Sequence, residues 1–154
     1  MEARDFRAVA TIVTTDFEAL YAYKHGGYQL CLQRSSENVH TLLNAKRVPV
    51  TIIMTNTEFI QLLDDDIVSM IALAVIVHPN FRNDGHYTAI DQLTLSLYLM
   101  TQCQLKLRHS LTSVTQTLDY TEDARKRHQS AHILDHLSLK LIERKVLSCI
   151  GHCS

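Results

Sequence analysis

The chain has 154 residues, of which 46% are hydrophobic and 20% charged, a balance typical of a folded globular protein and not of a disordered one. A formal net charge of −1 at pH 7 removes the simplest argument for a bulk nucleic-acid binder. Four glycines and two prolines are too few for the many turns of an all-β sandwich.

The length predicts a single domain, 1–154, with a mixed half over 1–80 and a helical half over 86–150. The longest apolar run, 67–77, is too short to cross a bilayer as a helix, so no membrane span is expected. No amino-terminal segment resembles a secretion signal, and most of the cysteines are far apart. We therefore expect an intracellular protein, cytoplasmic or nuclear.

The first segments of the chain favour strands. Residues 8–14 are rich in β-branched side chains, which predicts a strand. Two alternating runs, 20–23 and 28–33, flank Gly26 and Gly27, and both glycines can take a positive φ without steric cost. This pattern predicts a β-hairpin.

Short helices complete the first half. Their apolar spacing and polar entry residues predict helices at 39–45, 56–63 and 67–77, with a strand over 48–54 after the first of them. The acidic run 64–66 precedes the third helix, where carboxylates favour the positive end of the helix dipole. The first half is therefore expected to form a small sheet with short helices.

One apolar stripe dominates the second half. Positions at alternating spacings of three and four share one side of a predicted helix over 90–118, about 43 Å long. The stripe consists of Ile90, Leu93, Leu97, Met100, Gln104, Leu107, Leu111, Val114 and Leu118. The leucines over 93–99 also alternate with polar residues as in a strand. However, 100–103 contains no turn former to separate two strands, which favours the helix.

A second long helix is expected over 121–148, after a short polar connection at 119–123. A short loop between two long helices predicts an antiparallel hairpin. The predicted fold class is α+β and predominantly helical: a small amino-terminal sheet with short helices, followed by a long carboxyl-terminal helical hairpin.

The hairpin carries more apolar surface than two helices can bury, because Leu95 and Leu99 flank the main stripe. This surplus predicts a homodimer, the alternative being a monomer in which the first half covers the stripe. The predicted interface residues are Leu93, Leu97, Met100, Gln104, Leu107, Leu111 and Val114. Gln104 fits either alternative, because a buried amide can pair across an interface or inside one chain.

Basic residues form a second candidate surface. If the two long helices are antiparallel, these residues approach one another and form a positive strip that can hold phosphates. The strip consists of Lys106, Arg108, Arg125, Lys126 and Arg127. Glu122 and Asp123 lie close enough in sequence to neutralise part of it.

Histidines supply the candidate metal ligands. His128, His132 and His136 are spaced four apart, on one side of the predicted helix, so only a neighbouring pair can chelate one ion. A polar helix surface is the alternative. Cys149, His152 and Cys153 offer only three local ligands near the chain end, which is a poor preformed zinc site. No cofactor is expected.

No phosphate-binding glycine loop and no Gly-x-Ser-x-Gly elbow is present, so the sequence predicts that the protein is not an enzyme. The leading hypothesis is a protein-interaction or scaffold protein that self-associates, most simply as a dimer, through the helical hairpin. The alternative is a small RNA-binding or regulatory protein, such as a viral accessory protein, that uses the basic strip.

Overall fold

The structure is a computed structural model that describes residues 17–44, 51–53, 65–69, 72, 89–127 and 133–152. These residues are predominantly helical, as the sequence predicts. The elements are α2 (Tyr28–Asn44), β1 (Thr51–Ile53), β2 (Ala89–Asp91), α5 (Gln92–Lys106), α6 (Leu111–Arg127) and α7 (Ile133–His152). Residues 17–24 and 65–69 are also helical.

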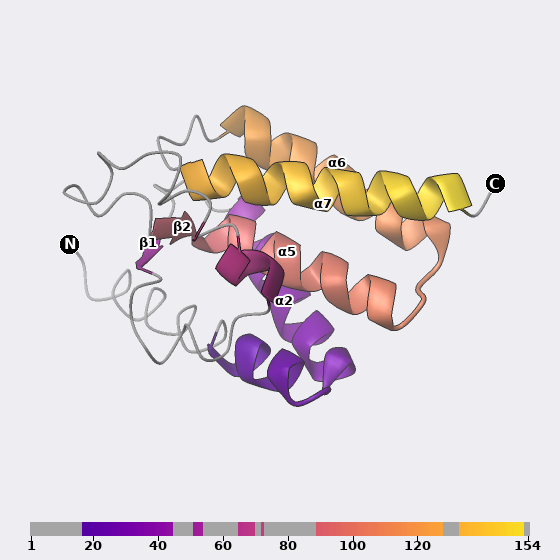
Figure 1. The fold of residues 1–154 in the computed structure, drawn as a ribbon, viewed down its shortest axis with the longest axis horizontal. Coiled ribbons are helices and arrows are strands. Elements are labelled where there is room, and N and C mark those ends of the chain that lie inside the picture. Colours follow the sequence, from indigo (N-terminus) through magenta and orange to yellow (C-terminus); the bar gives the residue numbers. More distant parts are fainter. Residues whose placement is uncertain are drawn as a thin grey trace.

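Helix α5 is the centre of the fold. It packs against α2 on one side and against α6 and α7 on the other, and α5, α6 and α7 run alternately in opposite directions (Figure 1). Every residue from 92 to 104 is buried, whichever side of the helix it occupies. A helix surrounded in this way has no solvent side, which explains why apolar residues follow both the predicted stripe and the positions beside it.

Polar side chains of the buried helix find partners inside the protein. Gln102 Nε2 donates to the Tyr98 hydroxyl at 3.0 Å, and Thr117 Oγ1 on α6 donates to Gln104 Oε1 at 2.7 Å. At the other end, the Asp91 backbone N–H donates to the buried Asp135 carboxylate of α7 at 2.7 Å. Because a buried polar group without a partner costs about 1–3 kcal/mol, these bonds fix how α5 sits against its neighbours.

The predicted amino-terminal hairpin is wrong. Residues 17–24 and α2 are helical, so Gly26 and Gly27 join two helices instead of two strands. Gly26 takes a φ of 81°, which glycine adopts without steric cost. An apolar pattern of only four to six residues is compatible with the period of a strand and with that of a helix. In α2 the buried residues Cys31, Ser35 and Leu43 follow the helical period. The expected helix 39–45 coincides, as far as residue 44, with the last part of this longer helix.

The described sheet has two short antiparallel strands, with Ile52 of β1 opposite Ile90 of β2. Strand β1 lies inside the predicted strand 48–54. Its partner comes from the second half, where the sequence analysis expected the start of the long helix. The predicted strand 8–14 and helix 56–63 lie outside the described residues, and the predicted helix 67–77 is described only at 67–69 and 72, where it is helical.

The single helix over 90–118 is also wrong, because α5 ends at Lys106 and α6 begins at Leu111. Arg108 adopts a left-handed backbone with a φ of 53°. The His109 N–H then bonds to the Gln104 carbonyl at 3.0 Å, and the Arg108 N–H bonds to the Leu105 carbonyl at 3.3 Å. This pair of bonds is a Schellman motif, which usually has glycine at the left-handed position.

The expected helix 121–148 is in fact two helices. Helix α6 continues through 119–123 to Arg127, and α7 begins at Ile133. Thr121 is tolerated within α6 because its hydroxyl donates to the Thr117 carbonyl at 2.9 Å. Three helices therefore replace the predicted two-helix hairpin. None of the described helices is long and apolar enough to cross a membrane.

We expect Thr117→Val to lower the free energy of unfolding by about 1–3 kcal/mol, because it leaves the buried Gln104 oxygen without the Thr117 donor. Thermal unfolding measures the loss. Thr112→Val is the matched control, since Thr112 lies on the same helix and is exposed. An equal loss in both variants would show that the hydrogen bond does not lock α6 to α5.

We expect Arg108→Gly to raise the free energy of unfolding by up to about 1 kcal/mol, because glycine takes the left-handed conformation without the penalty of a Cβ atom. Urea titration measures the change. Arg108→Ala keeps the Cβ atom and should give no such gain. If alanine stabilised as much as glycine, the arginine side chain and not the backbone would be the source of the effect.

Candidate functional site

The predicted interface stripe is part of the core. Five of its seven residues are buried within the single chain: Leu93, Leu97, Met100, Gln104 and Val114. Leu107 is half-buried, and the Leu111 side chain is outside the described part of the structure. The stripe contacts the neighbouring helices of its own chain, so a surface for another molecule must be sought elsewhere.

An exposed apolar groove lies where residues 17–24 meet α2. It has a volume of about 450 Å³ and is lined by Phe17, Glu18, Tyr21, Ala22, His25, Gly27 and Leu30. Among the described residues five large hydrophobic side chains are exposed, and three of them, Phe17, Tyr21 and Leu30, line this apolar groove. Tyr21 and Leu30 are 55% and 47% exposed, so roughly half of each faces solvent.

Helical spacing builds one wall of the apolar groove. Phe17, Tyr21 and His25 follow one another at intervals of four, and the Tyr21 and His25 rings meet edge to face with centroids 4.2 Å apart. The opposite side of this helical segment is buried at Ala19 and Leu20. The segment thus has two apolar sides, of which the core covers one.

The glycine turn builds the other wall. The Gly27 N–H donates to the Ala22 carbonyl at 2.7 Å, which folds the chain back sharply, and α2 then places Leu30 beside the first helix. A Cβ atom at Gly27 would lie 3.3 Å from the Ala22 carbonyl oxygen, tighter than most such contacts. A small residue at this position therefore suits the close approach of the two helices.

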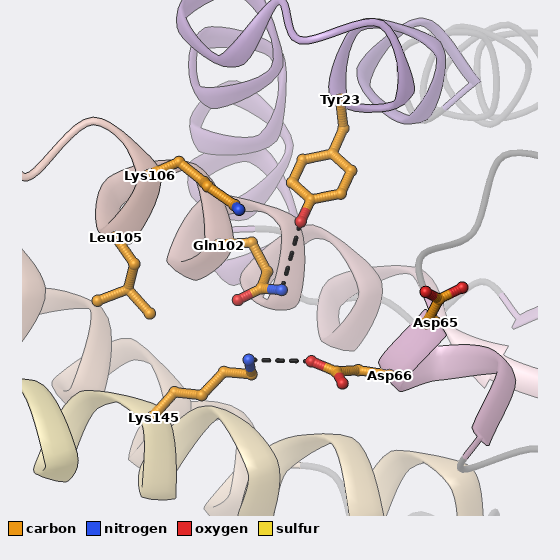
Figure 2. A pocket seen from close by; sticks show the side chains of 7 residues that line it. All are labelled: Tyr23, Asp65, Asp66, Gln102, Leu105, Lys106 and Lys145. Atoms are coloured by element: carbon orange, nitrogen blue, oxygen red, sulfur yellow. Dashed lines mark hydrogen bonds and ion pairs between the residues drawn. The ribbon is translucent and has the colours of Figure 1, made fainter.

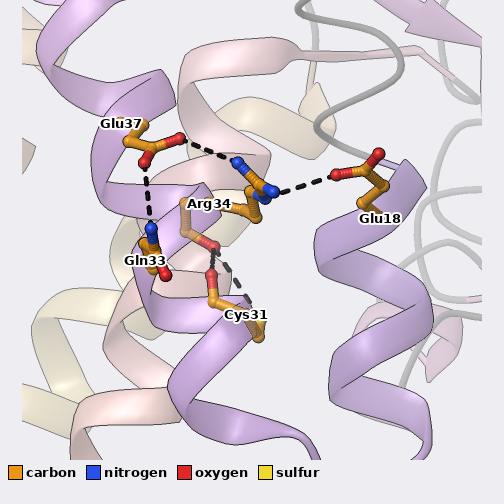
Figure 3. A network of polar contacts seen from close by, with 6 residues as sticks. Glu18, Cys31, Gln33, Arg34 and Glu37 are labelled. Carbon is orange, nitrogen blue, oxygen red and sulfur yellow. Dashed lines mark hydrogen bonds and ion pairs between the residues drawn. The ribbon is translucent and has the colours of Figure 1, made fainter.

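Ion pairs fix the two walls relative to each other. Arg34 of α2 contacts Glu18 at 3.3 Å and Glu37 at 3.4 Å, and Gln33 donates to Glu37 at 3.4 Å (Figure 3). Glu18 also lines the apolar groove. Because Arg34 bridges both helices, the network favours one angle between them, although each exposed pair contributes at most about 1 kcal/mol.

A second, polar cleft of about 500 Å³ lies between α5, α7 and residues 65–66 (Figure 2). Lys145 pairs with Asp66 at 3.0 Å, and Gln102 donates to the Tyr23 hydroxyl at 3.4 Å. Asp65 and Lys106 complete its charged lining. Two lysines balance two aspartates, so the polar cleft has no net charge that would select an ion.

The structure does not bring the basic residues together. Lys106 and Arg108 lie at the turn between α5 and α6, whereas Arg125 and Lys126 lie near the far end of α6. The distance along α6 is about 21 Å at the usual rise per residue. Arg125 pairs with Glu122 at 2.9 Å and Glu143 at 2.8 Å, and hydrogen bonding to Glu143 raises its pKa.

Of the three candidate histidine ligands, the structure describes only His136. His128 and His132 lie outside the described residues, between the end of α6 and the start of α7, and His136 is exposed on α7. Cys149 is half-buried, and the side chains of His152 and Cys153 are not described. Within the described ranges, no group of three His, Cys, Asp or Glu side chains is placed to hold a metal ion.

Sequence reasoning did not identify the apolar groove. The spacing of Phe17, Tyr21 and His25 was a usable signal, because it indicates an aromatic stripe on a helix. The spacing alone does not show that the core covers the other side of this helix, at Ala19 and Leu20. No protein-family model matches the chain, and the searches of curated proteins and of solved structures found no significant match.

We expect Arg125→Ala to lower the free energy of unfolding by no more than about 1 kcal/mol, with the difference shrinking at high salt, because its two ion pairs are partly exposed. Thermal unfolding at low and high ionic strength measures this. Lys126→Ala removes an exposed neighbouring charge and is the control. If the two variants were equally stable at low salt, the ion pair between Arg125 of α6 and Glu143 of α7 would not contribute to the stability of the protein.

Proposed function

We propose that this chain is a non-enzymatic interaction protein that self-associates as a weak homodimer through the apolar groove. The observation that carries the proposal is the gathering of exposed apolar side chains, Tyr21 and Leu30 above all, in one hollow bordered by charged residues. Contiguous exposed apolar surface with a polar border is typical of protein interaction sites. The docking surface is therefore different from the buried stripe on which the sequence hypothesis relied.

A second copy of the chain is the proposed occupant because the surface is self-complementary. Two apolar patches can face each other across a twofold axis. Glu18 lines the apolar groove, where it pairs with Arg34, and the exposed Lys24 ends the same helical segment, so this segment carries both signs of charge. The formal net charge of −1 adds little repulsion between two copies.

The size of the apolar groove sets the expected strength. Interfaces that bury less than about 1,200 Å² in total are weak and transient, and stable dimers need broad apolar surfaces. Most of the broad apolar stripe of α5 is already buried inside the chain. A rapid monomer–dimer equilibrium that depends on concentration is therefore expected, and not a permanent dimer.

The RNA-binding alternative depended on one continuous positive strip. Its basic residues lie at opposite ends of α6, and Arg125 is paired with two glutamates. No observation favours this alternative over the apolar groove. Nucleic-acid binding is instead one outcome that the following experiment detects.

Light scattering on a sizing column, over a range of protein concentrations, tests the proposal. The average mass should rise with concentration for the natural chain and stay at the monomer value for Leu30→Glu. Leu147→Glu is the matched control, because Leu147 is 50% exposed, lies outside the apolar groove and receives the same charge. This control should dimerise like the natural chain.

Three results would contradict the proposal. A natural chain that stays monomeric at every concentration would exclude self-association. Equal weakening by Leu30→Glu and Leu147→Glu would show that the apolar groove is not the interface. Excess absorbance at nucleic-acid wavelengths, lost on treatment with nuclease together with the higher mass, would support the RNA-binding alternative.

A further inference from the structure

The polar cleft is lined by one cation and one anion that have no ion-pair partner among the described residues. Lys106 ends α5 and Asp65 lies in the helical segment 65–69, and both residues are exposed. The other two charges of the same cleft, Lys145 and Asp66, pair with each other at 3.0 Å. We propose that the polar cleft binds a free amino acid, whose carboxylate pairs with Lys106 and whose ammonium group pairs with Asp65.

The arrangement of the four charges gives the polar cleft a positive and a negative end. Figure 2 shows Lys106 and Asp65 on opposite sides of the cleft, with the Gln102 amide between them. The ion pair of Lys145 with Asp66 attaches the helical segment of Asp65 to α7, so it holds Asp65 at its side of the cleft. The site is therefore neutral as a whole but polar from end to end. A free amino acid has the same property, because it carries one charge of each sign on different atoms.

A buried amide forms a fixed polar floor between the two ends. Gln102 is 8% exposed, and its Nε2 donates to the Tyr98 hydroxyl at 3.0 Å and to the Tyr23 hydroxyl at 3.4 Å. Because these bonds fix the amide and the Tyr23 side chain, little further ordering is needed when a ligand binds. The Tyr23 ring and Leu105 supply apolar surface against which the side chain of an amino acid can pack.

Size and charge favour a zwitterion over a simple ion. The polar cleft has a volume of about 500 Å³, and small-molecule sites in proteins usually measure about 300–1,000 Å³. An inorganic anion would be opposed by the two aspartates, and a metal cation by the two lysines. Because Lys106 and Asp65 are exposed, water screens both contacts, and we expect a Kd of about 0.1–1 mM.

Saturation-transfer NMR on the full chain tests the proposal, with the common free amino acids as individual probes. At least one of them should bind saturably, and NMR titration of the isotope-labelled chain then measures its Kd. Two derivatives of that amino acid remove one charge each: the amide lacks the carboxylate, and the N-acetyl form lacks the ammonium group. Each derivative should bind about two- to fivefold more weakly, which is the effect of losing one exposed ion pair.

Single substitutions assign the two ends of the ligand. Lys106→Ala should weaken binding of the amino acid about two- to fivefold and should then bind the amide equally well, because the partner of the carboxylate is gone. Asp65→Ala should in the same way remove the difference between the amino acid and its N-acetyl form. Lys126→Ala and Asp123→Ala are the matched controls, since each removes an exposed charge of α6 outside the polar cleft.

Four results would overturn the proposal. They are no saturable binding of any amino acid, equal binding of the amino acid and either derivative by the natural chain, equal losses in the cleft and control variants, and full discrimination against the amide after Lys106→Ala. The derivatives are compared on the natural chain, so the test stands even if a variant fails to fold. This inference does not depend on the proposed dimer, because the polar cleft and the apolar groove share no lining residue.

Discussion

The burial of α5 on every side is the constraint on which the rest of the structure depends. A helix in this position can satisfy its polar side chains only inside the protein, because water is excluded. The contact of Gln104 with Thr117 and that of Gln102 with Tyr98 meet this requirement, and the Asp91–Asp135 bond positions the start of the helix. These bonds do not drive folding, since their net contribution is modest. They select one arrangement of α2, α6 and α7 around α5, because other rotations would leave buried groups unpaired.

The sequence was a good guide to helix content and to the core, and a poor guide to where the chain turns. The apolar stripe correctly marked Leu93, Leu97 and Val114 as residues that must be covered, but periodicity does not say whether the same chain or another covers them. The turn after α5 was missed because Arg108 occupies a left-handed position that a sequence reader expects glycine to fill. At the Gly26–Gly27 pair the turn was predicted correctly, but a glycine pair does not indicate whether the turn joins two strands or two helices.

The candidate site was harder to predict than the fold, because a site depends on which surfaces remain uncovered. Phe17 and Tyr21 are large apolar residues of the kind usually found in a core. They face outward here because Ala19 and Leu20 bury the other side of their helix. For the basic residues, the sequence predicted a surface that the structure does not form. A single helical hairpin would bring them together, but an additional turn places Arg108 just before α6, whereas Arg125 lies near the far end of that helix.

The short connection between residues 24 and 28 joins the apolar groove to the core. Leu30 and Cys31 are neighbours in the first turn of α2, and helix geometry directs one toward the apolar groove and the other toward α5. Burial of Cys31 anchors this turn in the core, so in the proposed dimer Leu30 loses less conformational entropy on binding than a side chain on an unanchored segment would.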